Sequence, residues 1–137
     1  MVLSLSIPSA IYERIVSLAK AELPLEACGI LAGKDGSVEE FYEMTNTDKS
    51  ATHYMMEPAE QFAVIKKIRA AGTELLAVYH SHPKTPARLS EEDIRLALTP
   101  DATFAVLSLQ DKARPVMKAF VVEDGRSKEI GIEIVKG

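Results

Sequence analysis

The hydrophobic positions along the chain recur with two different periods, and these periods divide it into predicted strands and helices. Residues 2–7 alternate apolar side chains with serine, which is typical of a strand with one buried face. Apolar positions in residues 9–23 recur at helical spacing, and Pro24 then ends the predicted helix. Residues 26–33 form a mostly apolar run of small side chains, which favours a buried strand. A turn signal that contains glycine then leads into a returning strand at residues 37–45.

In the second half of the chain, segments with helical and with strand spacing of apolar residues again follow one another. Pro58 suits the first turn of an amphipathic helix, and Gly72 suits the position just past its end. Residues 75–79 are predicted to form a buried strand that runs into a His-Ser-His-Pro segment. The other predicted segments are a polar loop at residues 46–52, a short strand at 53–57, a helix at 90–98 and strands at 103–109, 115–123 and 129–135.

The resulting order of elements, β-α-β-β-α-β-α-β-β-β, sets the expected fold class. Helices separate strands that must pair non-locally, whereas the last three strands can form a meander. We therefore expect an α/β protein with a mixed central β-sheet flanked by helices. The length of 137 residues suits one domain, and the sequence shows neither an internal repeat nor a linker-like stretch. Residues 1–137 are predicted to form a single domain.

Composition and charge narrow the classes of function. Apolar residues make up 47% of the chain and charged residues 26%, as in ordinary soluble globular proteins. With 16 Lys and Arg against 20 Asp and Glu, the net charge is −4, which argues against a nucleic-acid-binding face. Cys28 is the single cysteine, so no internal disulfide can form, and the sequence suggests neither a signal peptide nor a membrane span. We expect a cytoplasmic protein that binds neither nucleic acid nor membrane.

Two histidines at the end of the strand predicted at residues 75–79 suggest a metal site. In an extended chain, residues two apart point to the same side, so His80 and His82 can reach one ion. Asp93 lies in the first turn of the next predicted helix and can supply a carboxylate. Two imidazoles and one carboxylate leave a fourth tetrahedral position open for water, as in catalytic Zn²⁺ sites. The ligand set alone would also accept iron or cobalt.

Hydrolysis at such a site also needs a group that moves protons, and Glu26, at the start of the small-residue strand, is the candidate. Ser90 is a candidate donor to a developing oxyanion. Plainer interpretations exist. A His-x-His pair alone is more often a matter of packing, and Ser90 with Asp93 makes a good helix capping box, which is compatible with the catalytic role. His53 is expected to be a surface or partly packed residue, and Cys28 a small buried hydrophobe.

Taken together, these residues resemble the JAMM (MPN-plus) metallopeptidase family. The pattern of that family is an upstream glutamate, then His-x-His, seven residues, Ser, two residues and Asp. Here the members are Glu26, His80, His82, Ser90 and Asp93, with every spacing satisfied, and the resemblance covers nearly the whole chain. It implies a mixed sheet flanked by helices, a fold related to that of zinc deaminases. It also implies that His80, His82 and Asp93 bind Zn²⁺, that Glu26 is the general acid/base and that Ser90 stabilises the oxyanion.

The chain passes quickly from residue 98 to residue 104, without the insertion with which larger members of that family read ubiquitin linkage. This compact form resembles stand-alone bacterial and archaeal members, which act on ubiquitin-like or small sulfur-carrier proteins with Gly-Gly tails. The resemblance therefore implies a peptidase or isopeptidase that hydrolyses the bond after such a tail. We expect the tail to add as an extra strand beside residues 46–57.

Two alternatives to this function stay open. One is a non-catalytic, metal-stabilised module that binds the tails of carrier proteins without cutting them. The other is a zinc hydrolase of small molecules on the same fold, although the deaminase signature needs a Cys-x-x-Cys pair and this chain has one cysteine.

Overall fold

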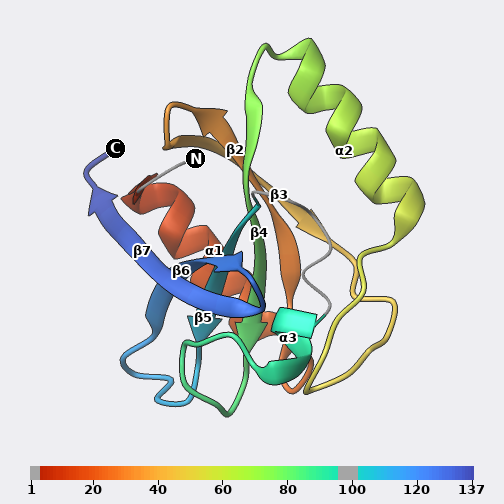
Figure 1. The fold of residues 1–137 in the computed structure, drawn as a ribbon, viewed down its shortest axis with the longest axis vertical. Coiled ribbons are helices and arrows are strands. Elements are labelled where there is room, and N and C mark those ends of the chain that lie inside the picture. Colours follow the sequence, from red (N-terminus) through yellow and green to blue (C-terminus); the bar gives the residue numbers. More distant parts are fainter. Residues whose placement is uncertain (1–3, 96–101) are drawn as a thin grey trace.

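The computed structural model describes residues 4–95 and 102–137 of the chain (Figure 1). The described helices and strands confirm the order of elements that the hydrophobic pattern predicted. The last part of the helix predicted at residues 90–98 lies outside the described residues. The elements are β1 (Ser4–Pro8), α1 (Ser9–Glu22), β2 (Cys28–Lys34), β3 (Ser37–Met44), α2 (Pro58–Ala70), β4 (Glu74–His82), α3 (Glu91–Arg95), β5 (Thr103–Ser108), β6 (Val116–Glu123) and β7 (Arg126–Val135).

The strands of the described chain form one mixed sheet in the order β1-β3-β2-β4-β5-β6-β7. β4 pairs with β5 in parallel, β1 pairs in parallel with both β3 and β7, and the other neighbours are antiparallel. The pairing of β1 with β7 closes the sheet into a barrel, with Ser4 opposite Gly131 and Pro8 opposite Val135. The predicted mixed sheet of an α/β protein is confirmed. Its closure was not predicted, because it joins segments from opposite ends of the sequence.

The helix α1 covers the inner face of this curved sheet and supplies the main core. Its buried residues Ile15 and Ala19 pack with side chains from all the described strands, among them Phe41 of β3 and Tyr79 of β4. The rings of Phe41 and Tyr79 meet edge to face, with centroids 5.7 Å apart. Burying one side chain of the size of Ile15 stabilises the fold by about 1.5–3 kcal/mol. This apolar layer therefore holds β4 firmly in place.

The helix α2 packs on the outer face of the sheet, against side chains of β3, β2 and β4, and lies to one side of the sheet in Figure 1. Its buried residues Val64 and Ile68 contact the cluster that contains Ile30 and Ala32 of β2. Because α1 covers one face of β2 and α2 the other, six of its seven residues are buried. This explains why the segment is a continuous run of small and apolar residues. Gly72 lies just past the end of α2 with a φ of 70°, as its position in the sequence predicted.

Residues 53–57, predicted to be a short strand, make one antiparallel bridge instead, between Asn46 and Met56. The N–H of Met55 donates to Oδ1 of Asn46 at 3.1 Å. In a continued ladder that N–H would bond to the carbonyl of Thr47, so the asparagine side chain replaces one rung of the pairing. The prediction of a strand was wrong for this reason.

The last strand, β7, begins at Arg126 rather than at residue 129, because Glu123 and Arg126 pair directly across the turn. None of the helices described within residues 4–95 and 102–137 has the length and apolar character needed to span a bilayer.

Candidate metal centre and active site

His80 and His82 lie at the carboxyl end of β4, between β2 and β5. The alternation of side chains along the strand directs both imidazoles away from the face of Tyr79, which belongs to the inner core. Both histidines are buried, and their Nε2 atoms are 3.0 Å apart. The expectation that the two rings lie on one face of a strand is confirmed.

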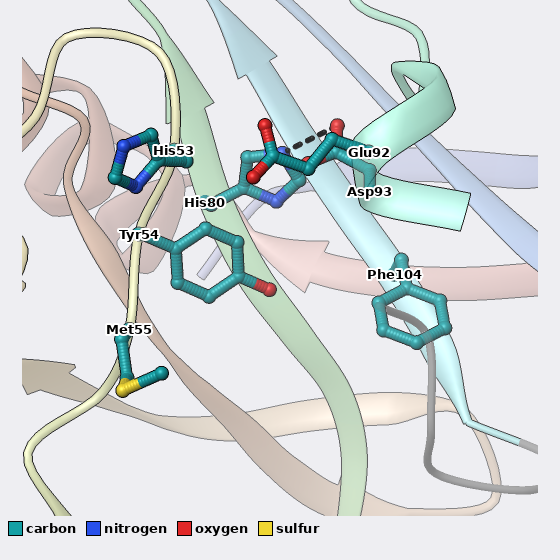
Figure 2. A pocket seen from close by; sticks show the side chains of 7 residues that line it. All are labelled: His53, Tyr54, Met55, His80, Glu92, Asp93 and Phe104. Carbon is teal, nitrogen blue, oxygen red and sulfur yellow. Dashed lines mark hydrogen bonds and ion pairs between the residues drawn. The ribbon is translucent and has the colours of Figure 1, made fainter. Parts of the chain in front are cut away.

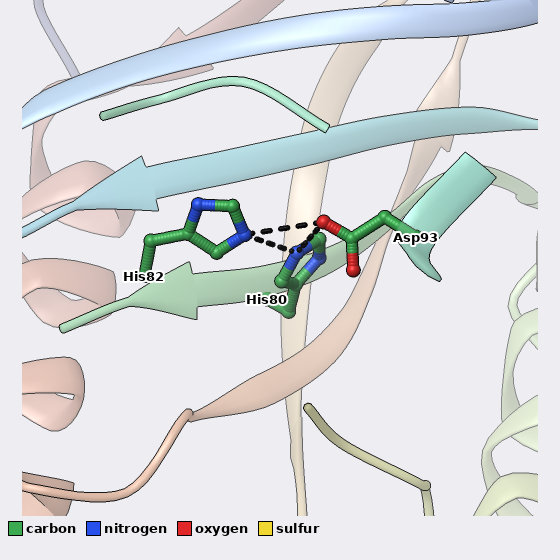
Figure 3. A group of neighbouring side chains, drawn as sticks. All are labelled: His80, His82 and Asp93. Carbon is green, nitrogen blue, oxygen red and sulfur yellow. Dashed lines mark hydrogen bonds and ion pairs between the residues drawn. The ribbon is translucent and has the colours of Figure 1, made fainter. Parts of the chain in front are cut away.

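The short helix α3 brings Asp93 to the same point. Its Oδ2 atom is 3.2 Å from Nε2 of His80 and 3.2 Å from Nε2 of His82 (Figure 3). A reciprocal capping box holds this carboxylate. The N–H of Asp93 donates to Oγ of Ser90 at 3.0 Å, and the N–H of Ser90 donates to Oδ2 of Asp93 at 2.9 Å. The capping box predicted from the sequence is therefore present, and it aims Asp93 at the imidazoles.

The geometry of these three residues fits a metal ion. One ligand atom from each lies within 4.8 Å of the others. Ligands about 2.0–2.1 Å from Zn²⁺ at the corners of a tetrahedron are about 3.3–3.4 Å apart. The three separations of 3.0, 3.2 and 3.2 Å are close to that spacing. Imidazole nitrogen and carboxylate oxygen are also donors that Zn²⁺ accepts, so both the spacing and the donor types suit such an ion.

The protonation states of His80 and Asp93 suit a cation as well, whereas that of His82 does not. Burial alone would lower the pKa of His82, but its hydrogen bonds to Asp93 and Pro86 outweigh this and raise that pKa in the metal-free protein. Burial lowers the pKa of His80, which favours the neutral imidazole that metals require. Burial alone would raise the pKa of Asp93, but hydrogen bonds from His80 and His82 outweigh it and hold that pKa well below its usual range. Asp93 is therefore ionised at neutral pH, and it offers a negative charge beside two nitrogen donors.

The two histidines are oriented by different contacts. Nδ1 of His82 donates to the carbonyl oxygen of Pro86 at 3.0 Å, which is the common way of holding a metal-binding imidazole. Nδ1 of His80 is buried and has no hydrogen-bond partner among the described residues. Instead, the ring of Tyr54 stacks on the ring of His80 (Figure 2).

Glu26 lies just before β2 and is placed beside β4 by the register of the two strands. The N–H of Ala27 donates to Oγ of Ser81 at 2.8 Å, and the N–H of Ser81 donates to the carbonyl oxygen of Ala27 at 2.9 Å. Continuing this antiparallel register by one residue puts Glu26 opposite His82. The proton-transfer candidate from the sequence therefore lies beside the group of His80, His82 and Asp93.

The carboxyl group of Glu26 is unusual in its surroundings. The residue is 2% exposed, and its Oε1 atom has no hydrogen-bond partner among the described residues. Burial raises the pKa of Glu26 to about 8, with His82 opposing the shift and Asp93 adding to it. A carboxyl group with a pKa near the working pH can both accept and release a proton, which suits general acid/base catalysis.

Asn46 is a buried residue that the sequence analysis did not single out. Its Nδ2 atom donates to the carbonyl oxygens of Glu26 and His53, each at 3.1 Å. Its Oδ1 atom accepts the N–H groups of Asp48 and Met55, each at 3.1 Å. Asn46 therefore ties the main chain at Glu26 to the loop that follows β3. In the sequence it is one polar residue in a polar loop, and no local pattern distinguishes it.

A cavity of about 220 Å³ opens beside the metal group, and Figure 2 shows the residues around it. The edge of the loop at Tyr54 and Met56 is free, since their backbone N–H and C=O groups bond to none of the described residues. The exposed side chain of Met55 and the ring of Phe104 add apolar surface to the cavity. An unpaired backbone edge next to an apolar cavity can accept an extended peptide.

Two further residues considered in the sequence lie apart from the metal group. His53 lines the same cavity, but its Nδ1 atom bonds to the carboxylate of Asp48 at 2.9 Å. Cys28 is fully buried in β2, with Sγ 3.7 Å from the carbonyl oxygen of Met44, as predicted for a small buried hydrophobe.

Comparisons with known proteins agree with this geometry. The sequence profile of a family described as prokaryotic homologs of the JAB domain matches residues 8–122. A protein of Mycobacterium tuberculosis named CysO-cysteine peptidase is 35% identical over 124 residues, which are 89% of this chain and 85% of that protein. A probable TtuB-protein conjugate cleaving protease of Thermus thermophilus is 35% identical over 69% of this chain and 64% of its own length. A desampylase of Haloferax volcanii is 28% identical over 66% of this chain and 67% of its own length.

Solved structures share the fold. A protein of Desulfitobacterium hafniense, known from a solution structure, superposes with a TM-score of 0.89 and 36% identity, over 97% of this chain and 94% of that one. A JAB1/MPN domain protein of Archaeoglobus fulgidus superposes with a TM-score of 0.60 and 20% identity, over 94% of this chain and 97% of that one. The second likeness bears on the fold alone, and it confirms the JAMM/MPN fold expected from the sequence.

Proposed function

Because this chain belongs to the family of prokaryotic homologues of the JAB domain, we propose that it is a zinc-dependent peptidase of ubiquitin-like or sulfur-carrier proteins. The bond that it cuts follows the C-terminal Gly-Gly tail of the carrier. Support comes from the names of two relatives, a CysO-cysteine peptidase and a probable TtuB-protein conjugate cleaving protease. Both names describe proteolytic cleavage, and both relatives are 35% identical to this chain over the matched region.

The observation that carries this proposal is the convergence of His80, His82 and Asp93 beside the buried carboxyl group of Glu26. The Nε2 atoms of both histidines and Oδ2 of Asp93 would hold Zn²⁺. When bound, the ion supplies Lewis-acid chemistry, which polarises a carbonyl and lowers the pKa of water. The hydrogen bonds from Ser90 to Asp93 and from His82 to Pro86 position these donors in advance, so little reorganisation is needed on binding.

The proposed role of Glu26 is to move protons. Its carboxylate takes a proton from the attacking water and then delivers it to the amine nitrogen of the leaving group. The pKa of about 8 belongs to the metal-free protein, and a nearby cation lowers the pKa of a carboxyl group. Glu26 would therefore be ionised and ready to accept a proton when the metal is present.

The proposed role of Ser90 follows from its hydrogen bonding. Its Oγ atom accepts the N–H of Asp93, so the hydroxyl hydrogen stays available to a second acceptor. We assign that acceptor as the oxygen of the scissile carbonyl, on which negative charge develops during hydrolysis.

The tail of the carrier would lie along the free backbone edge at Tyr54 and Met56. Main-chain hydrogen bonds to this edge would add the tail as an extra strand and lead it toward the metal group. The segment is one bridge rather than a strand, but its outward N–H and C=O groups are the ones that such pairing needs. Glycine residues suit a tail that must pass close beside Tyr54 to reach the metal, because they carry no side chain.

A cleavage assay tests the proposed function. Carrier proteins that end in Gly-Gly, and the CysO and TtuB proteins in the names of the relatives, are extended by one residue or by a longer segment and incubated with the zinc-loaded protein. Mass spectrometry then reports whether the product ends at the second glycine. We expect cleavage there, and loss of cleavage with a chelator. Intact substrates that nevertheless bind would identify a non-catalytic binding module instead.

A further inference from the structure

A second cavity lies on the other side of the metal group, where His82 and Ser90 form part of its wall. Its volume is about 420 Å³, within the range of about 300–1,000 Å³ that is usual for small-ligand pockets. The charged side chains on its wall are those of Arg88 and Glu91. This cavity is therefore next to the proposed zinc position and carries a guanidinium group, whereas no arginine is among the described residues that line the cavity beside Tyr54.

The backbone of Arg88 is tied to the metal group. The carbonyl oxygen of Pro86 accepts two hydrogen bonds, from Nδ1 of His82 at 3.0 Å and from the N–H of Arg88 at 2.9 Å. The neighbours of Arg88 in the sequence, Ala87 and Leu89, are both buried. The loop therefore presents Arg88 from a position that is fixed relative to His82.

A second anchor holds the other part of the same loop. Oγ of Ser108, the last residue of β5, donates to the carbonyl oxygen of Thr85 at 2.6 Å. The N–H of Leu109 donates to the carbonyl oxygen of His82 at 3.0 Å. Because β5 and β4 pair in register at this point, the loop has little freedom to move away from the metal group.

The charge of Arg88 is available to a ligand. The side chain is exposed, and its guanidinium group makes no ion pair within 4.0 Å to any described carboxylate, including Glu91 on the same wall. A guanidinium group binds a carboxylate through two parallel hydrogen bonds, so its preferred ligand in such a pocket is a carboxylate anion.

The path proposed for the substrate places its leaving group, which is the part beyond the scissile bond, in the cavity that Arg88 lines. With the tail along Tyr54 and Met56, the scissile carbonyl reaches the metal from the side of His80. The group beyond the scissile bond then continues to the side of His82 and Ser90, where Arg88 lies. A carboxylate next to the scissile nitrogen occurs when one amino acid, with its own free carboxyl group, follows the tail.

We infer that Arg88 binds the free α-carboxylate of a single amino acid joined to the terminal glycine of the carrier, and so selects carrier–amino acid conjugates as substrates. This inference rests on the proposed function and names its leaving group. In the reaction the amide C–N bond breaks, the oxygen of water joins the glycine carbonyl carbon, and the amine nitrogen receives a proton. The products are the carrier with a free Gly-Gly carboxylate and the free amino acid.

Kinetics with matched substrates test the selection. Each carrier is extended by one alanine that ends either in a free carboxylate or in an amide, and kcat/KM is measured for both. A hydrogen bond between charged groups changes a binding constant by about tenfold or more. We therefore expect kcat/KM for the carboxylate form to exceed that for the amide form by at least about tenfold. Arg88→Ala should abolish this preference. The matched control is Arg126→Ala, an exposed arginine in the β6–β7 hairpin, and it should keep the preference.

A binding measurement keeps the inference testable apart from cleavage. Zinc-loaded Glu26→Gln protein is titrated with the tripeptide acetyl-Gly-Gly-Ala, as the acid and as the amide, and the side-chain Nε–H signal of Arg88 is followed by NMR. Its assignment comes from its loss in Arg88→Lys. A shift with the acid and none with the amide is expected.

Three outcomes separate the ideas. Equal cleavage of the acid and amide substrates, or a preference that survives Arg88→Ala, would overturn the role of Arg88 while leaving the proposed function intact. Absence of cleavage of every carrier, together with a shift of the Arg88 signal by the acid, would overturn the proposed function and support the carboxylate site. If the Nε–H signal of Arg88 does not shift when the acid is added, the proposed carboxylate site at Arg88 is wrong, whether or not carriers are cleaved.

Discussion

The ring of Tyr54 stacks on the ring of His80, with centroids 4.7 Å apart and ring planes inclined by 20°. Tyr54 comes from the loop after β3, and His80 from the end of β4, so the contact joins the proposed tail-binding edge to the metal group. Nδ1 of His80 has no hydrogen-bond partner among the described residues, so the stack and the contacts of Nε2 with His82 and Asp93 together orient this ring.

Removing this stack should weaken metal binding. We expect Tyr54→Ala to lower zinc affinity by roughly tenfold, which is the low end of the effect of losing a residue that orients a ligand. Tyr54→Phe keeps the stacked ring and should bind zinc as the wild type does. Competition against a chromogenic chelator measures both affinities. Equal affinity in all three proteins would show that the orientation of His80 does not depend on Tyr54.

The proton-transfer role of Glu26 predicts a separation of metal content from turnover. A glutamine side chain has nearly the same shape as glutamate, and position 26 lies outside the group of His80, His82 and Asp93. The Glu26→Gln protein should therefore keep its zinc. Its turnover of a carrier substrate should fall by about two or more powers of ten, because water and leaving group lose their proton carrier. Elemental analysis and a turnover assay on one preparation check both parts. Near-normal turnover in zinc-loaded Glu26→Gln would remove Glu26 from the mechanism.

Substitution of a proposed ligand should remove the metal itself. We expect His80→Ala and Asp93→Ala to be purified with far less than one zinc per chain, as measured by elemental analysis. His53→Ala is the matched control, because His53 lines the adjacent cavity but lies outside the group of three. It should keep the wild-type metal content. Full zinc occupancy in both His80→Ala and Asp93→Ala would contradict the assigned ligands.

The buried carboxyl group of Glu26 predicts a pH dependence of stability in the metal-free protein. Burial raises its pKa from 4.5 to about 8, so the folded state holds its proton more tightly than the unfolded state. The stabilisation is fully present below pH 4.5 and is lost as pH rises toward 8. One pKa unit corresponds to about 1.4 kcal/mol. The shift of the Glu26 pKa from 4.5 to about 8 therefore corresponds to a loss of several kcal/mol in the free energy of unfolding. Denaturant unfolding with a chelator across this range measures it.

The comparison with Glu26→Gln isolates that contribution from those of the histidines and Asp93. The amide does not titrate, so the free energy of unfolding of the variant should fall much less between acidic and alkaline pH. Parallel pH profiles for the wild type and Glu26→Gln would show that burial of Glu26 does not raise its pKa.

Asn46 should contribute to both stability and turnover. Asn46→Ala leaves the buried carbonyl of Glu26 without its partner, which costs about 1–3 kcal/mol when it finds no other, and it also removes three partly buried hydrogen bonds, to His53, Asp48 and Met55. We expect a lower free energy of unfolding and a lower kcat, with zinc content unchanged. Asn46→Asp keeps an oxygen for the N–H groups of Asp48 and Met55 and should be intermediate. A loss of stability without any loss of kcat would limit Asn46 to a structural role.

Local patterns in the amino-acid sequence were enough to predict the order of helices and strands, the mixed sheet and the family. Period and length separate strands from helices, because each backbone conformation repeats its side-chain directions at its own spacing. The same rule placed His80 and His82 on one face, and the chemistry of helix ends explains Ser90 with Asp93. These features depend on residues that are close together in the sequence.

Contacts between distant segments could not be predicted in this way. The register of β2 against β4 puts Glu26 opposite His82, and a shift of one residue would turn its side chain to the other face of the sheet. The stack of Tyr54 on His80, the four hydrogen bonds of Asn46 and the closure of β1 on β7 join segments whose approach depends on how the whole core packs. Periodicity describes which way a side chain faces along its own strand or helix. Which partner it meets there is settled by the packing of α1 and α2 against the two faces of the sheet.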